Sequence, residues 1–225
     1  MRLPAKELLK HHMDCLYTYE NGRMTSVNEP WGSTQPAPRL IVGRTVQGEL
    51  LYRLGQRADA GFAEQAEKLL SRGIFEASAY ETQLHAQCVE QCCCFYYPHS
   101  EVPPFDSQLL SVEDAALLSA SYSAGFEDCR DELDTAQLFA VSFCDEKIVS
   151  ICRSVRKGLG HEAGIETLAP FRRQGYAGSA LRCWTAAMLR QGNIPLYSAS
   201  IDNRASMQLA RKHRYALYAN TLALD

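Results

Sequence analysis

The hydrophobic and polar positions along the chain repeat with two different periods, and these periods predict its helices and strands. Apolar residues three or four positions apart indicate amphipathic helices, whereas alternation or short apolar runs indicate strands. Helices are expected over residues 4–17, 60–72, 77–90 and 203–213, with two more that open near Ser111 and beyond Gly175. Strands are expected over residues 39–45, 49–54, 137–144, 147–153, 164–168, 195–201 and 215–224, and a hairpin over 17–28.

The apolar stripes of these helices identify residues expected in the core. They are Leu8, Leu9, Met13 and Leu16 in the first helix, Ala115, Leu118 and Tyr122 in the helix from Ser111, and Leu181, Trp184 and Met188 in the helix after Gly175. Asn21-Gly22 and Asp145-Glu146 are expected to join strands, and Gly73 and Gly192 to end helices. The run Ser111-Val-Glu-Asp114 resembles a capping box in which Asp replaces the usual Glu.

The order of these elements divides the chain near residue 105. The run Pro98-His-Ser-Glu-Val-Pro-Pro104 is a natural linker, because proline and polar residues interrupt both periods. Residues 1–105 are expected to form a smaller α+β domain. Residues 106–225 alternate strands with helices, which is typical of an α/β domain.

Composition limits the class of protein further. The 225 residues are 46% apolar and 22% charged, as in ordinary globular proteins that bury a core without disulfide staples. The net charge of −3 argues against a broad face for nucleic acid. No apolar run reaches the roughly 18 residues of a membrane span, and the N-terminus lacks the apolar core of a signal peptide. We therefore expect a cytoplasmic protein that binds neither nucleic acid nor a membrane.

Nine cysteines are many for a chain of this length, and four of them stand close together. Cys88 and Cys92-Cys93-Cys94 lack the two separated C-x-x-C pairs of a zinc site, and consecutive strand residues point to alternating faces. Because Phe95-Tyr-Tyr97 continues the run, we interpret these cysteines as reduced thiols packed in a strand. No metal is expected.

The segment that carries most chemical information is Thr167-Leu-Ala-Pro-Phe-Arg-Arg-Gln-Gly-Tyr-Ala-Gly-Ser-Ala-Leu181. It leaves an apolar strand, turns through Arg172-x-x-Gly175-x-Ala177, and opens a helix. Free backbone N–H groups at the positive end of a helix suit a diphosphate, and small residues let the backbone come close. Arg172, Arg173 and Gln174 can add side-chain donors. The alternative is an ordinary tight connection with two solvated arginines.

A second motif follows the next strand. Asn203, Ser206, Leu209, Lys212 and Tyr215 have the spacing N-x-x-S-x-x-L-x-x-K-x-x-Y. In this order the two motifs resemble those of the GNAT superfamily of acyl-CoA N-acyltransferases. The resemblance covers about residues 106–225, and the first half resembles the additional N-terminal domain of a subset of bacterial members.

The resemblance implies a fold, a donor substrate and the residues that bind it. The fold would be a mixed, strongly twisted sheet flanked by helices, within the α/β class. The donor would be acetyl-CoA, and the implied contacts are Thr167, Leu168, Arg172, Arg173, Gln174, Gly175, Tyr176, Ala177, Gly178, Asn203 and Ser206. The acceptor would be a primary amine that attacks the thioester directly. A small molecule and a peptide are both open as acceptor, and a homodimer is open as the assembly.

Two positions depart from the pattern of the family. The tyrosine that often follows the leucine of the second motif, and protonates the leaving thiolate, is Ala210 here. The glycine before the final aromatic residue is Arg214, where a positive φ would carry strain. The sequence therefore defines the proton chemistry less completely than the binding of the donor.

Candidate bases lie on the strand before the turn, where members of the family often carry a carboxylate. Glu162 and Glu166 are four positions apart and share one face of a regular strand, although solvated or ion-paired carboxylates are the alternative. His161 is a further candidate base, in an expected loop. Tyr218 or Tyr215 can replace the missing acid, or both can be packing aromatics of the last strand.

Other roles depend on the resemblance. A backbone N–H near Thr167 or Leu168 would stabilise the tetrahedral oxyanion. Asn203 suits both an N-cap and a donor contact. Trp31 and its proline-rich loop either cover the acceptor site or form an exposed connection. The missing tyrosine also permits a non-catalytic acyl-CoA-binding regulatory module as an alternative function.

Overall fold

The computed structural model describes residues 3–30, 32, 35–110, 114, 126 and 139–225. The first half contains α1 (Ala5–Leu16), β1 (Tyr17–Glu20), β2 (Arg23–Val27), β3 (Leu40–Thr45), β4 (Leu50–Leu54), α2 (Ala60–Ser71), α3 (Ala77–Leu84) and β5 (Cys88–Tyr96). The second half contains β6 (Ser107–Leu110), β7 (Phe139–Cys144), β8 (Lys147–Lys157), β9 (Gly160–Thr167), the 3-10 turn η3 (Ala169–Phe171), α5 (Tyr176–Arg190), β10 (Ile194–Ser200), α6 (Arg204–Lys212) and β11 (Ala216–Leu224).

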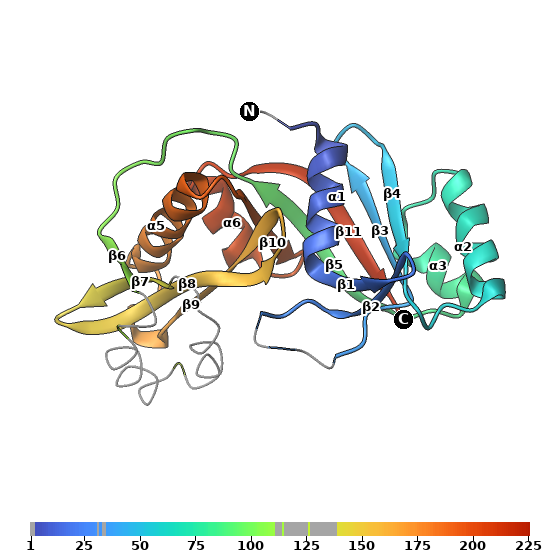
Figure 1. Ribbon diagram of the computed structural model, residues 1–225, viewed down its shortest axis with the longest axis horizontal. Coiled ribbons are helices and arrows are strands. Elements are labelled where there is room, and N and C mark those ends of the chain that lie inside the picture. The colour runs from blue at the N-terminus through green and yellow to red at the C-terminus, as the bar shows by residue number, and fades with distance from the viewer. Residues whose placement is uncertain (1–2, 31, 33–34, 111–113, 115–125, 127–138) are drawn as a thin grey trace.

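One mixed sheet runs through the whole molecule (Figure 1). Its nine strands lie in the order β4-β3-β11-β5-β10-β9-β8-β7-β6, and β1 pairs with β2 in a separate hairpin. β9 and β10 run parallel, whereas their other neighbours in the sheet run antiparallel. This mixed sheet with flanking helices confirms the predicted fold class.

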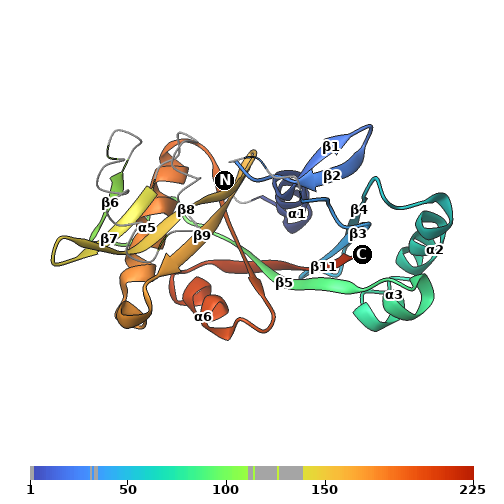
Figure 2. The ribbon, with the colours of Figure 1, turned by 90° about the horizontal axis from the view of Figure 1, so that it is seen from below.

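Helices cover both faces of the sheet. Figure 2 shows α1 and α6 on opposite sides of β5 and β11. Alternating residues of β3 explain this arrangement, because Ile41 packs in the core under α1 while Leu40 and Val42 pack in the core under α2 and α3. Over the second half of the sheet, α5 and α6 cover the face opposite α1.

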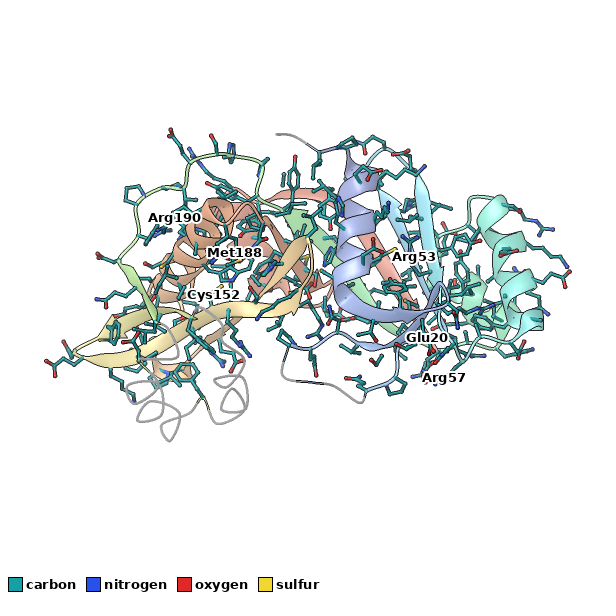
Figure 3. The ribbon with its side chains drawn as sticks, viewed as in Figure 1. Glu20, Arg53, Arg57, Cys152, Met188 and Arg190 are labelled. Atoms are coloured by element: carbon teal, nitrogen blue, oxygen red, sulfur yellow. The ribbon has the colours of Figure 1, made fainter. Side chains whose placement is uncertain are left out.

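The predicted buried face of α5 is confirmed. Leu181 and Trp184 are 0% exposed and Met188 is 3% exposed. They pack in one core with Cys152 of β8, and Figure 3 labels Cys152 and Met188 between that strand and the helix. The stripe of apolar residues therefore fixes which side of α5 faces the sheet.

β5 joins the two halves of the sequence. It lies between β10 and β11, with Cys94 opposite Ser198 on one side and Ala219 on the other. The division into residues 1–105 and 106–225 stays a prediction of the sequence. The hydrogen-bonded sheet crosses that boundary, which falls between β5 and β6.

The helix predicted over residues 77–90 is wrong in its second half. α3 ends at Leu84, His85 takes the left-handed conformation with φ 49°, and β5 begins at Cys88. Val89 is β-branched and suits a strand, and β5 pairs with β11 from Cys88 onward. Long-range pairing therefore outweighs the local helical period, and the predicted strand over the cysteine run is confirmed.

The predicted hairpin turns are also confirmed. Asn21, Gly22, Asp145 and Glu146 all have positive φ, as the favoured two-residue hairpin loops require. The helix predicted from Ser111 and the side chain of Trp31 lie outside the described residues. Within the described part of the chain, each helix is too short or too polar to cross a bilayer.

Candidate functional site

The turn between β9 and α5 has the geometry of an anion site. Gly175 is the N-cap of α5 with φ 98°, a conformation that strains any residue with a side chain. Among the residues that the structure describes, no side chain caps the start of this helix. The N–H groups of Tyr176 and Ala177 therefore have no acceptor inside the helix and lie at its positive end. Phosphate groups bind at helix starts of this kind.

Side chains of the turn brace its own backbone. Arg172 Nε donates to Thr167 O at 3.1 Å, and Gln174 Nε2 donates to Pro170 O at 2.9 Å. Arg173 has φ 62°, so the turn also holds a residue other than glycine in the left-handed region. Arg172 keeps further guanidinium donors beyond the one used for the turn. The turn is thus both tight and cationic.

We call the cavity beside this turn the loop cleft, and its volume is about 1390 Å³. It lies between the end of β9, the turn, the start of α5 and the start of α6. Ten of the eleven predicted donor contacts line it: Thr167, Leu168, Arg172, Arg173, Gly175, Tyr176, Ala177, Gly178, Asn203 and Ser206. Gln174 is the predicted contact that is not among the lining residues. The structure thus brings the two sequence motifs together at one cavity.

The start of α6 is organised as the sequence predicts. Asn203 Oδ1 accepts a hydrogen bond from Ser206 N at 3.0 Å, which confirms Asn203 as an N-cap. Ser206 Oγ lies 2.7 Å from the hydroxyl of Tyr197, which forms part of the wall of the loop cleft. The contact of Asn203 and Ser206 with a donor substrate stays a prediction.

His213 is a residue of the loop cleft that the sequence analysis missed. A Cβ on Gly178 would lie 2.1 Å from His213 Nε2, so the glycine lets the end of α6 approach α5. Arg182 Nη1 donates to His213 Nδ1 at 2.9 Å. Burial and the charge of Arg182 lower the pKa of His213 to about 4, so the ring is neutral at neutral pH. Its position after the second motif was the available signal.

β9 and β10 separate beside the loop cleft. Their parallel pairing runs from Gly160 opposite Ile194 to Glu162 opposite Leu196, and beyond that point β10 pairs only along its other edge, with β5. The consecutive residues Tyr197 and Ser198 then point to opposite faces. Tyr197 lines the loop cleft, whereas Ser198 lines a second cavity on the α1 side of the sheet. Two cavities therefore reach one point of the sheet from opposite faces.

We call the second cavity the helix cleft, and its volume is about 560 Å³. The sheet forms its floor, and α1, β1 and the segment before β3 form its walls. The proline-rich loop contributes Pro36 and Pro38 to the lining. Whether this loop covers the acceptor site stays a prediction, and Trp31 itself lies outside the described residues.

Glu162 is a buried carboxylate in the wall of the helix cleft. It is 6% exposed, and its Oε1 accepts from His12 Nε2 at 3.0 Å and from Ser198 Oγ at 2.5 Å. Burial alone would raise the pKa of Glu162, but the hydrogen bonds from His12 and Ser198 and the charges of His12 and Arg156 lower it overall. Glu162 is therefore ionised at neutral pH.

His12 of α1 completes this arrangement. It is 1% exposed, and its two ring nitrogens contact the hydroxyl of Tyr218 and the carboxylate of Glu162. Burial alone would lower the pKa of His12, but Cys94 and Glu162 outweigh burial and raise that pKa to about 10. Nε2 therefore donates to Glu162, and Nδ1 shares the second contact with the Tyr218 hydroxyl. The predicted candidates Glu162 and Tyr218 are brought together through a residue of the first helix.

The sequence analysis assigned no role to His12. The residue lies on the same stripe as Leu8, Leu9 and Met13, three or four positions along α1. A histidine inside an otherwise apolar stripe was the available signal, because a buried imidazole needs hydrogen-bond partners. Those partners lie 150 and 206 residues away in the sequence, so no local pattern could name them.

Glu166 has a different environment from Glu162. Its Oε1 lies 2.8 Å from Arg153 Nη2, and its side chain is 40% exposed at the edge of the loop cleft. Next to it, Leu168 N donates to Val149 O at 3.0 Å, so that N–H belongs to the sheet. Successive residues of an antiparallel strand direct their N–H groups to opposite edges of that strand. Because the N–H of Leu168 points to β8, the N–H of Thr167 points to the other edge of β9, toward the gap left by β10. Of the two predicted oxyanion donors, Thr167 is therefore the one whose N–H is not used by β8 within the described strands.

The remaining candidates have structural partners. The hydroxyl of Tyr215 lies 2.6 Å from Thr185 Oγ1 in the core under α5, so this tyrosine packs there. His161 lies in β9, and the loop predicted for it is wrong. Its Nδ1 lies 3.0 Å from Ser154 Oγ, and burial together with Lys157 lowers the pKa of His161 to about 4.

The two departures from the family pattern are also visible. Ala210 is 0% exposed in the core beside α5, and it carries no group that can transfer a proton. Arg214 has φ 67°, which confirms the predicted positive φ at a residue other than glycine.

The chain is similar to known acetyltransferases in sequence pattern and in fold. A family model described as GNAT acetyltransferase matches residues 65–221. A GCN5-related N-acetyltransferase from Kribbella flavida is 16% identical, with a TM-score of 0.54 over 100% of this chain and 95% of that chain. A GNAT-family acetyltransferase from Colwellia psychrerythraea is 13% identical, with a TM-score of 0.51 over 82% of this chain and 81% of that chain.

A GNAT-family structure from Novosphingobium aromaticivorans is 17% identical over 62% of this chain and 66% of that chain, with a TM-score of 0.49. No curated protein sequence matches the chain. The family model covers more than half of the 225 residues, and the structures from Kribbella flavida and Colwellia psychrerythraea share the fold. The chain belongs to the GNAT acetyltransferase family.

Proposed function

We propose that the protein transfers an acetyl group from acetyl-CoA to a primary amine. Membership of the family supports acyltransferase activity. The observation that carries the finer proposal is the meeting of two cavities at the gap between β9 and β10. One cavity holds the turn suited to a diphosphate, and the other holds a buried, ionised carboxylate.

The donor would bind in the loop cleft. The first-turn N–H groups of α5 and the arginines of the turn would hold its diphosphate. The acyl arm would then enter the gap where β10 leaves β9. The N–H of Thr167 faces this gap and would donate to the oxyanion of the tetrahedral intermediate.

The acceptor amine would bind in the helix cleft, close to Glu162. An amine of pKa ~10.4 must lose a proton, which costs roughly 4.6 kcal/mol at pH 7. That first proton leaves to solvent before the attack. A carboxylate in the wall of the cavity can then accept a second proton, from the nitrogen of the attacking neutral amine, as the C–N bond forms and the C–S bond breaks. The electron pair of the C–S bond leaves with the thiolate.

The leaving group is the smaller problem. If the thiol has a pKa of ~8.5, releasing it as a thiolate at pH 7 costs about 1.5 pH units, or roughly 2 kcal/mol. The buried Ala210 cannot protonate the leaving sulfur. Departure of the unprotonated thiolate nevertheless costs less than deprotonation of the amine. The same absence is what favours the second candidate, a module that binds acyl-CoA without turnover.

Calorimetry with CoA and a thiol-release assay over small amines and peptides test these proposals. Acetyl transfer predicts both binding and turnover, and binding without turnover on any amine would favour the module. Replacing Gly175 by valine should weaken CoA binding at least tenfold, because the backbone at φ 98° cannot keep its cradle.

Gly192→Val is the matched control for this variant. Gly192 has φ 76° at the opposite end of α5, so the substitution introduces similar strain far from the turn. It should lower the melting temperature and leave CoA affinity unchanged. Equal affinities of the two variants for CoA would contradict the placement of the diphosphate at the turn.

A further inference from the structure

A buried polar cluster ties α1 to the point where the two clefts meet. It consists of His12 from α1, Glu162 from β9, Ser198 from β10, Cys94 from β5 and Tyr218 from β11. Four neighbouring strands and a helix from the far end of the sequence each supply one member. Apolar residues of α1 and the sheet surround the cluster. Acyl transfer as set out above assigns a task to Glu162 alone.

We propose that His12 is a positioning residue for acyl transfer, which holds the Glu162 carboxylate ionised and oriented with Oε2 toward the helix cleft. The inference rests on the proposed function, because Glu162 is the base there. His12 lies outside the two sequence motifs that are expected to bind the donor, so the proposal adds a residue that neither motif contains. The first helix would be part of the catalytic site.

The two oxygens of Glu162 are used differently. Within the described residues, the hydrogen bonds from His12 and Ser198 both end on Oε1, and Oε2 receives none. Glu162 lines the helix cleft although it is more than nine-tenths buried. Oε2 is therefore the oxygen available to a ligand. A carboxylate fixed through one oxygen presents the other in a constant direction.

His12 supplies the charge that this arrangement needs. A buried carboxylate without a partner would take up a proton and lose its capacity as a base. Arg156 lies opposite Glu162 on β8, but its guanidinium binds Val155 O and Glu29. His12 is the cation that hydrogen-bonds to Glu162 in the described part of the chain.

The ring of His12 is itself held on both sides. The Tyr218 hydroxyl contacts Nδ1, which leaves Nε2 directed at Glu162. Leu9 and Met13 anchor the same face of α1 in the core. Other titratable or charged groups that act on the pair from neighbouring elements are Cys15 of α1, Tyr17 of β1, Cys92 and Cys94 of β5, Arg156 of β8 and Tyr197 of β10.

The proton inventory is simple. The amine nitrogen attacks the thioester carbon, the C–N bond forms, and the amine proton passes to Glu162 Oε2. The C–S bond breaks and the thiolate leaves with the electron pair. His12 keeps its protons throughout, so it steadies the carboxylate before the transfer and does not exchange protons with the substrate.

Two substitutions test this role. His12→Gln keeps an N–H donor without the charge, and His12→Phe removes both. Each should raise the pKa of Glu162 and move the acid limb of the kcat profile by about 1–2 pH units toward higher pH. At its optimum kcat should fall by about 10- to 100-fold in the Phe variant, and by less in the Gln variant. His11→Gln on the same helix should leave the profile in place.

A titration without turnover separates this inference from the proposed function. Carbon-13 NMR of glutamate-labelled protein reports the pKa of Glu162, with the signal assigned by its loss in Glu162→Gln. A higher pKa of Glu162 in both His12 variants supports the proposal. An unchanged pKa in both, or a fall of kcat with the pH profile in place, would overturn it. Absence of turnover in the wild type would count against the proposed function alone.

Discussion

Glu162 and Glu166 stand on the same strand, yet their surroundings give them different chemistry. Glu162 is buried beside His12 in the wall of the helix cleft, whereas Glu166 is partly exposed and paired with Arg153. A base must reach the acceptor with a free lone pair. At the scale of single residues, geometry therefore favours Glu162 over Glu166.

The prediction at this scale compares two matched substitutions. Glu162→Gln should lower kcat by about 10²- to 10⁴-fold, the usual contribution of a general base. Glu166→Gln should change kcat by only a few fold, because its carboxylate is engaged by Arg153. Both variants should bind CoA with nearly the affinity of the wild type. The converse pattern of losses would move the base to Glu166.

The same pair sets a pH dependence of stability. His12 has a raised pKa, so its contribution is complete below pH 6.5 and is lost as pH rises through about 10. Glu162 has a lowered pKa, so its contribution is present above its ordinary value of 4.5 and is lost on further acidification. The pair thus stabilises the fold most strongly between about pH 4.5 and 6.5.

At the scale of elements, the contact between α5 and α6 depends on one missing side chain. Gly178→Ala places a Cβ 2.1 Å from His213 Nε2, so the ring must move and lose its bond with Arg182. We expect a loss of about 1–2 kcal/mol in the free energy of unfolding. Urea denaturation measures it.

In the control background, we expect Gly178→Ala to change the free energy of unfolding in the opposite direction. With His213→Ala in the background, the same Gly178→Ala change should stabilise α5 by about 0.5–1 kcal/mol, since alanine is the better helix former. A double-mutant cycle isolates the difference. Equal effects in both backgrounds would show that the glycine is not needed for the approach of α6.

Elements whose signals are local were predictable from the sequence. The stripe of Leu181, Trp184 and Met188 gave the buried face of α5, and positive-φ residues such as Asn21 gave the turns. The helix over 77–90 failed because β11, more than a hundred residues later, decides where β5 begins. The role of His12 could not be predicted for the same reason, because its partners lie on strands that the sequence does not place beside α1.

At the scale of the whole molecule, the position of β5 makes the two halves interdependent. A fragment of residues 106–225 lacks the strand between β10 and β11, which would leave both with unpaired edges. We expect that fragment alone to aggregate or to show poor dispersion of its amide signals by NMR. Adding a fragment of residues 1–105 should restore the dispersion.

The intact chain should unfold in one step for the same reason. A single urea transition followed by circular dichroism and by tryptophan fluorescence is expected. Two separate transitions, or a well-dispersed spectrum of the 106–225 fragment alone, would show that the predicted boundary at residue 105 is a true division between domains.

The insertion of β5 also has a consequence for synthesis. β5 is made before residue 100, but both of its partners, β10 and β11, lie after residue 193. A nascent chain would therefore carry the apolar run from Cys92 to Tyr97 without a covering strand until β10 is made, because β10 begins only at Ile194. Contacts of such long sequence separation form slowly, so the ribosome-bound chain is the state of this protein most exposed to aggregation and to chaperones.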